Sequence, residues 1–284
     1  WSYAIALAFF GAVMGATDVS MNTNAVIVEK LAGRRLLSGM HAFWSIGCFA
    51  SAGLFSVLAS SSSNVTLIAT LHCAIVLALL AVFGRHLLDY KSPGSEKACA
   101  IPRGIVIVLG ILACISFLVE GAVMDWSGVL LTEVKNMDIA LAGTGYAIFS
   151  VAMLIMRLLG DKTVQFLGEQ KAVIGGSIVT AAGFALVVVL DNLYLNAFAF
   201  ILIGLGCANI VPVFYSLLKY QKGMPISAAV TSVTSLGYTG VILGPALLGF
   251  VAHGINISTV FELVALLLVI EAGIAKYVFC KLKM

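Results

Sequence analysis

The stretch GAVMGATDVSMNTNAVIVEKLAGRRLLSGMHAFWSIG, residues 11–47, carries an acid and two amides within an apolar segment and then enters a basic turn. Asp18, Asn22 and Glu29 fall on one face of a helix, because four and seven residues separate them. Asp18 precedes Lys30 by twelve residues, roughly 18 Å along a helix, near the middle of a bilayer core of about 30 Å. A carboxylate there costs at least about 2.5 kcal/mol. We therefore expect Asp18 to face an internal cavity; an acid that is merely hydrogen-bonded inside a helix bundle is the alternative.

Composition identifies a membrane protein. The chain is 61% hydrophobic and only 10% charged, and its mean hydropathy is +1.11, outside the usual range of soluble domains. The net charge of +3 then gives no indication of a nucleic-acid partner. The cysteines form no CxxC pair, so neither a disulfide framework nor a zinc site is expected, and no other cofactor is indicated. They are Cys48, Cys73, Cys99, Cys114, Cys207 and Cys280.

Nine apolar segments are each long enough to cross a bilayer as a helix, at about 20 residues per crossing. Helices are expected because lipid offers no partner for free backbone groups, and no short alternating segments indicate a barrel. The predicted fold is an all-α polytopic helix bundle. The segments are approximately 1–29, 39–59, 64–84, 104–130, 139–159, 171–190, 193–218, 226–251 and 256–279.

The basic residues fix the predicted orientation. Fifteen of the 16 lie in one alternating set of loops or at span ends beside them, and only Lys135 lies in the other set. By the positive-inside rule the first set is cytoplasmic, which places Trp1 outside and Met284 inside a cytoplasmic (inner) membrane.

Trp1 lacks the basic segment of a signal peptide. An odd number of spans ahead of it would explain an outside start, so we expect a fragment. The polar segment Arg85–Arg103 contains Pro93, Gly94 and Pro102 and is predicted to link two bundles. The predicted domains are 1–84, the second half of an N-terminal bundle; 85–103, a cytoplasmic linker; and 104–284, a six-helix bundle.

Sequence similarity between the two halves of the chain supports this division. HAFWSIGCFASAG at 41–53 is similar to TSVTSLGYTGVILG at 231–244, and GAVMGA at 11–16 stands opposite IGLGCA at 203–208. Parallel repeats of this kind are typical of transporters, with the substrate site at the repeat interface. Chance similarity between spans rich in small residues is the alternative.

In sequence and order, these segments resemble the major facilitator superfamily from its fourth of twelve spans onward, within the branch of MosC-like and fucose-permease-like carriers. The resemblance covers nearly the whole chain. It rests on GATDVSMNTNAVIVE (15–29), HAFWSIG (41–47), EGAVMDW (120–126), RLLGDKTVQFLGEQK (157–171) and SLGYTGVILGPALLGF (235–250).

The resemblance implies roles for several residues. Fucose:proton symporters have an acid followed four residues later by Asn in the fourth span, and Asp18 with Asn22 matches that arrangement. It implies a protonatable group beside a polar substrate contact. The segment 157–171 resembles the family's loop between the eighth and ninth spans, so Arg157, Asp161 and Lys162 would form a cytoplasmic gate. An ordinary rim of snorkelling side chains is the alternative.

Three further residues are predicted to contact the cavity. Glu120 lies roughly 25 Å along a helix from Arg103, in the outer half of its span. Asn209, followed by Pro212, is expected to bend the seventh span toward the cavity, and Tyr238 belongs to the eighth span. The histidines within spans, His41 and His72, are expected to be packed rather than to relay protons. Glu262 and Glu271 have no partner that the sequence identifies.

No HExxH, GxSxG or GxxxxGK[ST] pattern is present, so neither an enzyme nor an ATP-driven pump is expected. We expect a monomeric secondary transporter for a small polar solute, a sugar, a polyol or a related metabolite, with protons as the coupling ion. A non-transporting membrane sensor or a degenerate half-carrier is the alternative, and a channel is a weaker one because no repeated pore loop is evident.

Overall fold

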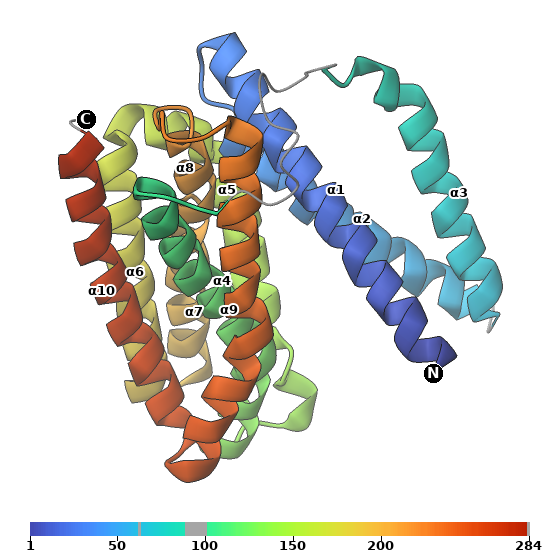
Figure 1. The fold of residues 1–284 in the computed structure, drawn as a ribbon. Helices are drawn as coiled ribbons and strands as arrows, with labels where there is room; N and C mark the ends of the chain where they lie inside the picture. The colour runs from blue at the N-terminus through green and yellow to red at the C-terminus, as the bar shows by residue number, and fades with distance from the viewer. Residues whose placement is uncertain (62–63, 89–100, 283–284) are drawn as a thin grey trace.

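The structure is a computed structural model that describes residues 1–61, 64–88 and 101–282, and within them all regular structure is helical. Its elements form two groups (Figure 1). The first group is α1 (Ser2–Ala32), α2 (Leu37–Ser61), α3 (Val65–Phe83) and η1 (Gly84–His86). The second is α4 (Ile105–Val129), η2 (Leu130–Val134), η3 (Ile139–Leu141), α5 (Thr144–Leu167), α6 (Glu169–Val189), α7 (Leu193–Cys207), α8 (Ile210–Leu217), α9 (Ile226–Gly254) and α10 (Ile257–Leu282).

The second group is a closely packed bundle. α4 packs on α9 and α10, and α6 packs on α7 and α10. Aromatic residues such as Phe184, Phe200 and Phe261 are fully buried between these helices. Small residues permit the close approach: a side chain at Gly240 would collide with the carbonyl of Cys114 across the α4–α9 contact. Dispersion between such closely packed helices is a main source of stability where lipid removes the hydrophobic driving force.

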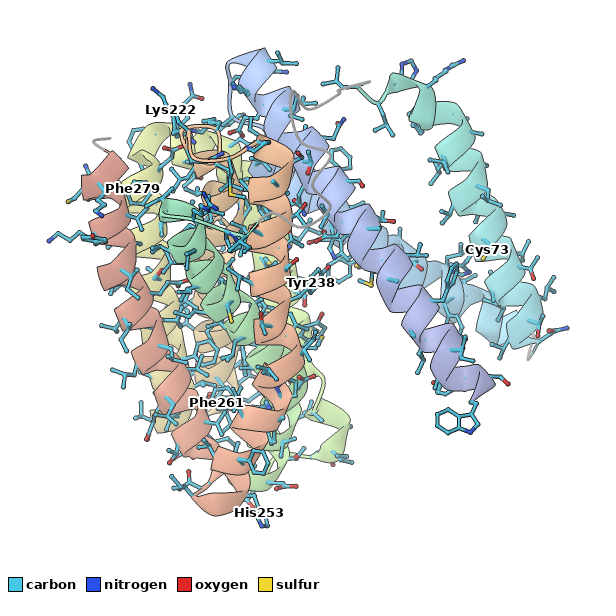
Figure 2. All side chains as sticks on the ribbon, in the orientation of Figure 1. Cys73, Lys222, Tyr238, His253, Phe261 and Phe279 are labelled. Carbon is cyan, nitrogen blue, oxygen red and sulfur yellow. The ribbon has the colours of Figure 1, made fainter. Side chains whose placement is uncertain are left out.

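The first group contacts this bundle from one end as far as the middle of its helices. α1 contacts α8 and α9, and α2 contacts α5 and α8. In Figures 1 and 2 the two groups lie together near Lys222 and diverge toward the end that carries Trp1 and His253. Ion pairs show which of the loops between helices lie at the same end of the molecule. Lys135 pairs with Asp191 at one end, whereas Arg35 pairs with Glu169 at the other.

Eight of the described helices are long and apolar enough to cross a membrane, against nine predicted spans. The segment 39–59 is not among these eight; it forms α2, a helix of 25 residues. The all-α polytopic fold itself is confirmed. The predicted boundaries of the domains stay a prediction, and residues 89–100 of the expected linker lie outside the described residues.

One predicted boundary was wrong in a way that matters for function. The segment 139–159 continues to Leu167, so Arg157, assigned to a cytoplasmic loop, lies inside α5 and is buried. The helix continues because no proline or glycine pair interrupts it before Gly168, whose φ of 82° ends it. The segment 193–218 is interrupted where the bend is predicted: α7 ends at Cys207 and α8 begins at Ile210, which places Pro212 in its first turn.

Candidate functional site

Asp18 lies at the contact between the two groups of helices, together with two other predicted site residues. The Asn22 side chain, on the next turn of α1, donates from Nδ2 to the Asp18 Oδ1 at 3.1 Å and to its carbonyl at 3.0 Å. The hydroxyl of Tyr238, from α9, is within hydrogen-bonding reach of the Asp18 carboxylate. Tyr238 lies about halfway along α9 (Figure 2). An acid, an amide and a phenol thus meet between the groups.

An aromatic layer missed by the sequence analysis lies next to this cluster. The fully buried Tyr215 of α8 shares a hydrogen bond of 2.7 Å with the hydroxyl of Thr234 of α9. The ring of His41 of α2 stacks on Tyr215, with centroids 6.0 Å apart. Three helices from both groups meet here. The only signal in the sequence was the position of Tyr215 one turn after Pro212, which does not identify its partners.

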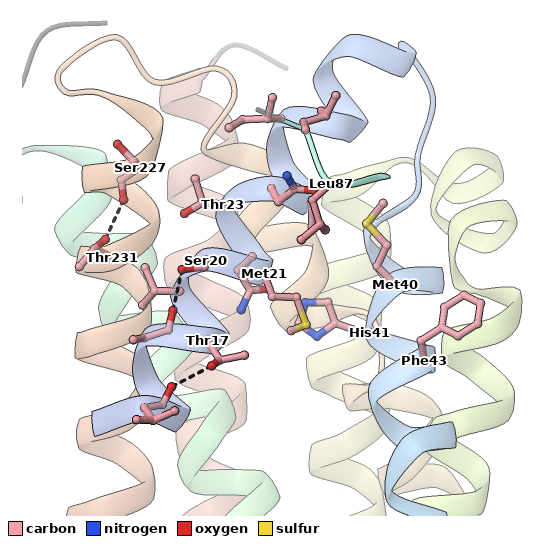
Figure 3. A pocket seen from close by; sticks show the side chains of 18 residues that line it. Thr17, Ser20, Met21, Thr23, Met40, His41, Phe43, Leu87, Ser227 and Thr231 are labelled. Carbon is pink, nitrogen blue, oxygen red and sulfur yellow. Dashed lines mark hydrogen bonds between the residues drawn. The ribbon is translucent and has the colours of Figure 1, made fainter. Parts of the chain in front are cut away.

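Asn22 and His41 also line a hollow of about 950 Å³ between α1, α2 and α9. Met21 and His41 point toward each other across it, and Thr17, Ser20 and Thr231 contribute hydroxyls (Figure 3). These hydroxyls donate to backbone carbonyls of their own helices. By contrast, the buried Asn22 Oδ1 and His41 Nε2 have no hydrogen-bond partner among the described residues. Buried polar atoms without partners are candidates for contact with water or a ligand.

Arg157 lies deeper than a cytoplasmic gate residue would. Its guanidinium donates to Ser45 Oγ of α2 at 3.2 Å, to Glu120 Oε1 of α4 at 3.3 Å and to the carbonyl of Ala208 at 3.4 Å. Two predicted site residues, Arg157 and Glu120, are therefore brought together, although their sequence positions predict opposite ends of the membrane for them. Asn209, in contrast, packs its amide against Gly160 beside Ser38.

Glu29 forms the strongest polar link between the groups. Its Oε1 accepts from Ser216 in the last turn of α8 at 2.6 Å and from Lys219, just after α8, at 2.8 Å. Its Oε2 accepts from the backbone N–H groups of Leu36 and Leu37 at 3.0 and 3.1 Å. The sequence placed Glu29 on the face of Asp18 but gave no sign of Lys219, 190 residues away.

Asp161 continues this arrangement from the bundle side. Its carboxylate accepts from the backbone N–H groups of Ser38 and Gly39 at 3.1 and 2.9 Å. Together Glu29 and Asp161 satisfy four successive N–H groups at the start of α2, which a helix leaves without internal partners. Lys162 is exposed and forms no ion pair among the described residues. The gating role of Arg157, Asp161 and Lys162 stays a prediction.

The remaining acids of the last span differ from each other. Glu271 is fully buried and accepts hydrogen bonds from Ser116 at 2.6 Å and Ser177 at 3.0 Å, whereas Glu262 is exposed. Among the described residues no group of His, Cys, Asp and Glu could hold a metal ion.

These features define a polytopic helical membrane protein with a polar site between two helix groups, and comparison with known proteins gives the family. No family model matches the sequence. The chain is 40% identical over 276 residues to an uncharacterised MFS-type transporter of Yersinia pestis, covering 97% of this chain and 72% of the relative. The chain therefore belongs to the major facilitator superfamily of transporters.

Other relatives agree with the predicted branch. An uncharacterised transporter of Sinorhizobium fredii is 31% identical over 279 residues, 96% of this chain and 73% of the relative. The membrane protein MosC of Rhizobium meliloti is 26% identical over 274 residues, 96% of this chain and 66% of MosC.

Two solved structures share the fold. The Escherichia coli fucose:proton symporter FucP aligns with a TM-score of 0.63 at 14% identity, over 85% of this chain and 68% of FucP. The human organic anion transporter MFSD10 aligns with a TM-score of 0.54 at 15% identity, over 63% of this chain and 43% of MFSD10. At these identities the likeness extends to the fold alone.

Proposed function

We propose that the protein is a proton-coupled secondary transporter that moves a small polar solute across the cytoplasmic membrane by alternating access, as a monomer. The single observation that carries this proposal is the position of Asp18. It is a partly buried acid on α1 that accepts a hydrogen bond from Asn22 of its own helix and lies within reach of Tyr238 on α9 of the other group.

The arrangement of the two groups supports alternating access. Polar contacts of Glu29 and Asp161 join them at one end, while the ribbons diverge toward the other end (Figure 1). With the basic ends of the helices in the cytoplasm, the contacts lie on the cytoplasmic side. The structure then corresponds to a carrier conformation that is closed on that side. Opening it requires the loss of those contacts, so they would act as the gate. The gate then consists of Glu29 and Lys219 in addition to Asp161.

The chemistry of Asp18 supports coupling to protons. Asp18 accepts a hydrogen bond from Asn22, and an ionised carboxylate can also accept from the nearby Tyr238 hydroxyl, while a neutral carboxyl group can itself donate to a solute hydroxyl. Burial disfavours the charged form of a carboxyl group. Because Tyr238 belongs to the other helix group, proton binding would weaken a contact between the groups. A solute that binds the protonated carrier more tightly shifts this equilibrium, and that difference in affinity is the source of coupling.

The test is transport by the natural full-length protein in proteoliposomes, with a panel of labelled hexoses, polyols and sugar acids. Asp18→Asn should keep exchange of the transported solute across the membrane but lose its accumulation under a proton gradient. Asp125→Asn is the matched control, because Asp125 is an exposed acid of α4, and it should accumulate solute normally. Undiminished accumulation by Asp18→Asn would show that another group carries the proton.

A further inference from the structure

Arg157 is a buried cation that bridges three parts of the structure. It lies on α5 one helical turn from Asp161, and its side chain is only 8% exposed. It contacts Ser45 of the first helix group as well as Glu120 and the Ala208 carbonyl of the second. A charged side chain inside a membrane protein is costly and usually lies along a substrate or ion pathway.

The contacts of Arg157 are loose compared with the other ion pairs. Its three hydrogen bonds measure 3.2, 3.3 and 3.4 Å, whereas Arg35 contacts Glu169 at 2.7 Å and Lys219 contacts Glu29 at 2.8 Å. Charge-assisted hydrogen bonds are ordinarily about 2.7–2.9 Å long. A guanidinium has about five N–H donors, so Arg157 keeps donors that no described residue accepts.

The pair with Glu120 is also incomplete. One guanidinium nitrogen meets one carboxylate oxygen, although arginine and a carboxylate can form two parallel hydrogen bonds. The side chain of Glu120 is 26% exposed, against 8% for Arg157. Glu120 is therefore the more accessible member of the pair, and Arg157 is the more enclosed one.

From this geometry we infer that Arg157 recognises a carboxylate on the transported solute, which replaces Glu120 on the guanidinium. The inference rests on the proposed transport function and narrows its substrate to a small polar acid, such as a sugar acid. A monoanion fits because the site offers one permanent cation, and a carboxylate matches the planar fork of the guanidinium. Replacing one carboxylate by another leaves the charge on Arg157 compensated throughout. Because Arg157 also holds Ser45 of α2, an occupied site would alter a contact between the two groups.

The test compares solutes that differ only in the carboxylate: D-galacturonate with D-galactose, and D-glucuronate with D-glucose. Binding to the purified full-length protein is measured by thermal shift and by titration at one pH. We expect at least one acid to bind tenfold or more tightly than its neutral counterpart. Binding of neither acid, or equal binding of an acid and its neutral counterpart, would overturn the inference.

Substitutions test whether Arg157 is the residue that causes the preference for the acidic solute. Arg157→Gln alone leaves Glu120 unpaired and could disturb folding, so the double variant Arg157→Gln/Glu120→Gln is tested beside it. The double variant should lose the preference for the acid, and Glu120→Gln alone should strengthen acid binding severalfold by removing the competitor. Arg157→Lys keeps the charge but not the fork and should lose most of the preference. Arg34→Gln, at an exposed arginine, is the matched control and should bind like the wild type.

Failure of this inference and failure of the transport function give different results. A preference for the acid that survives in the folded double variant would remove Arg157 from recognition. Proton-driven uptake of a neutral solute by the wild-type protein, without a preference for the matching acid, would uphold transport while excluding recognition of a carboxylate. If the folded wild-type protein took up neither acidic nor neutral solutes, the proposed transport function itself would fall.

Discussion

Two regions of α1, only three helical turns apart, hold their acids in opposite ways. At the end of the helix, Glu29 is buried and accepts four hydrogen bonds, which come from Ser216, Lys219 and two backbone N–H groups. In the middle, Asp18 is partly exposed, accepts one such bond at 3.1 Å from Asn22 and lies within reach of Tyr238.

The difference separates a locking role from an exchange role. A carboxylate whose lone pairs are all used, with a lysine beside it, stays ionised and resists change. A carboxylate with few partners can take a proton or a new donor at low cost. On one helix, therefore, Glu29 suits a gate contact and Asp18 suits the proton-binding site. Of the four experiments below, three test one side of that contrast and the last tests the orientation on which it depends.

The largest effect is expected from Glu29→Ala. The substitution leaves Lys219, Ser216 and two N–H groups of α2 without their acceptor. Removing one partner of a buried pair typically costs about 3 kcal/mol or more. The apparent melting temperature of the purified protein should fall clearly. Glu133→Ala, at an exposed glutamate, should leave it nearly unchanged; an equal change in both variants would contradict the locking role.

Asp161→Ala should have a smaller effect. It removes the acceptor for the N–H groups of Ser38 and Gly39, but Glu29 still caps the first residues of α2. Loss of one capping carboxylate costs about 1 kcal/mol. The same melting measurement applies, with Asp125→Ala as the control. A loss as large as that of Glu29→Ala would mean that the two carboxylates do not share the capping of α2.

Tyr238→Phe tests the exchange side of the contrast. The substitution deletes one hydroxyl and keeps the ring, which contacts Phe117 with centroids 5.9 Å apart. Since Asp18 retains Asn22, we expect a stability change of at most about 1 kcal/mol, together with altered proton-driven accumulation. Tyr194→Phe, at an exposed tyrosine, is the control. Unchanged accumulation in Tyr238→Phe would remove this residue from the proton-binding site.

The last experiment changes stability least and tests the orientation on which the gate depends. In a background without cysteines, Cys is introduced at Lys222 or at His253, which lie at opposite ends (Figure 2). A maleimide that cannot cross the membrane should label the His253 position in intact cells. The Lys222 position should react only after the membrane is opened. The reverse pattern would place the contacts of Glu29 and Asp161 at the outer face.

Part of the site could be predicted because it depends on one helix. The spacing of Asp18, Asn22 and Glu29 fixes their shared face once the segment is helical, and Asn22 does contact Asp18. Arg157 shows the limit of the same method. Its charge predicted a loop, but its partners Glu120 and Ser45 compensate it inside the membrane, and those partners come from two other helices.

The sequence by itself determined the membrane environment, the helices and the polar face of α1, because hydropathy and a period of 3.6 residues are local properties. Only the tertiary structure decided that Glu29 meets Lys219, that Asp18 meets Tyr238 and that Arg157 meets Ser45. Which helix faces which depends on small residues such as Gly240 and Gly204 that let backbones approach. That packing places residues more than a hundred positions apart in contact, and no local pattern encodes it.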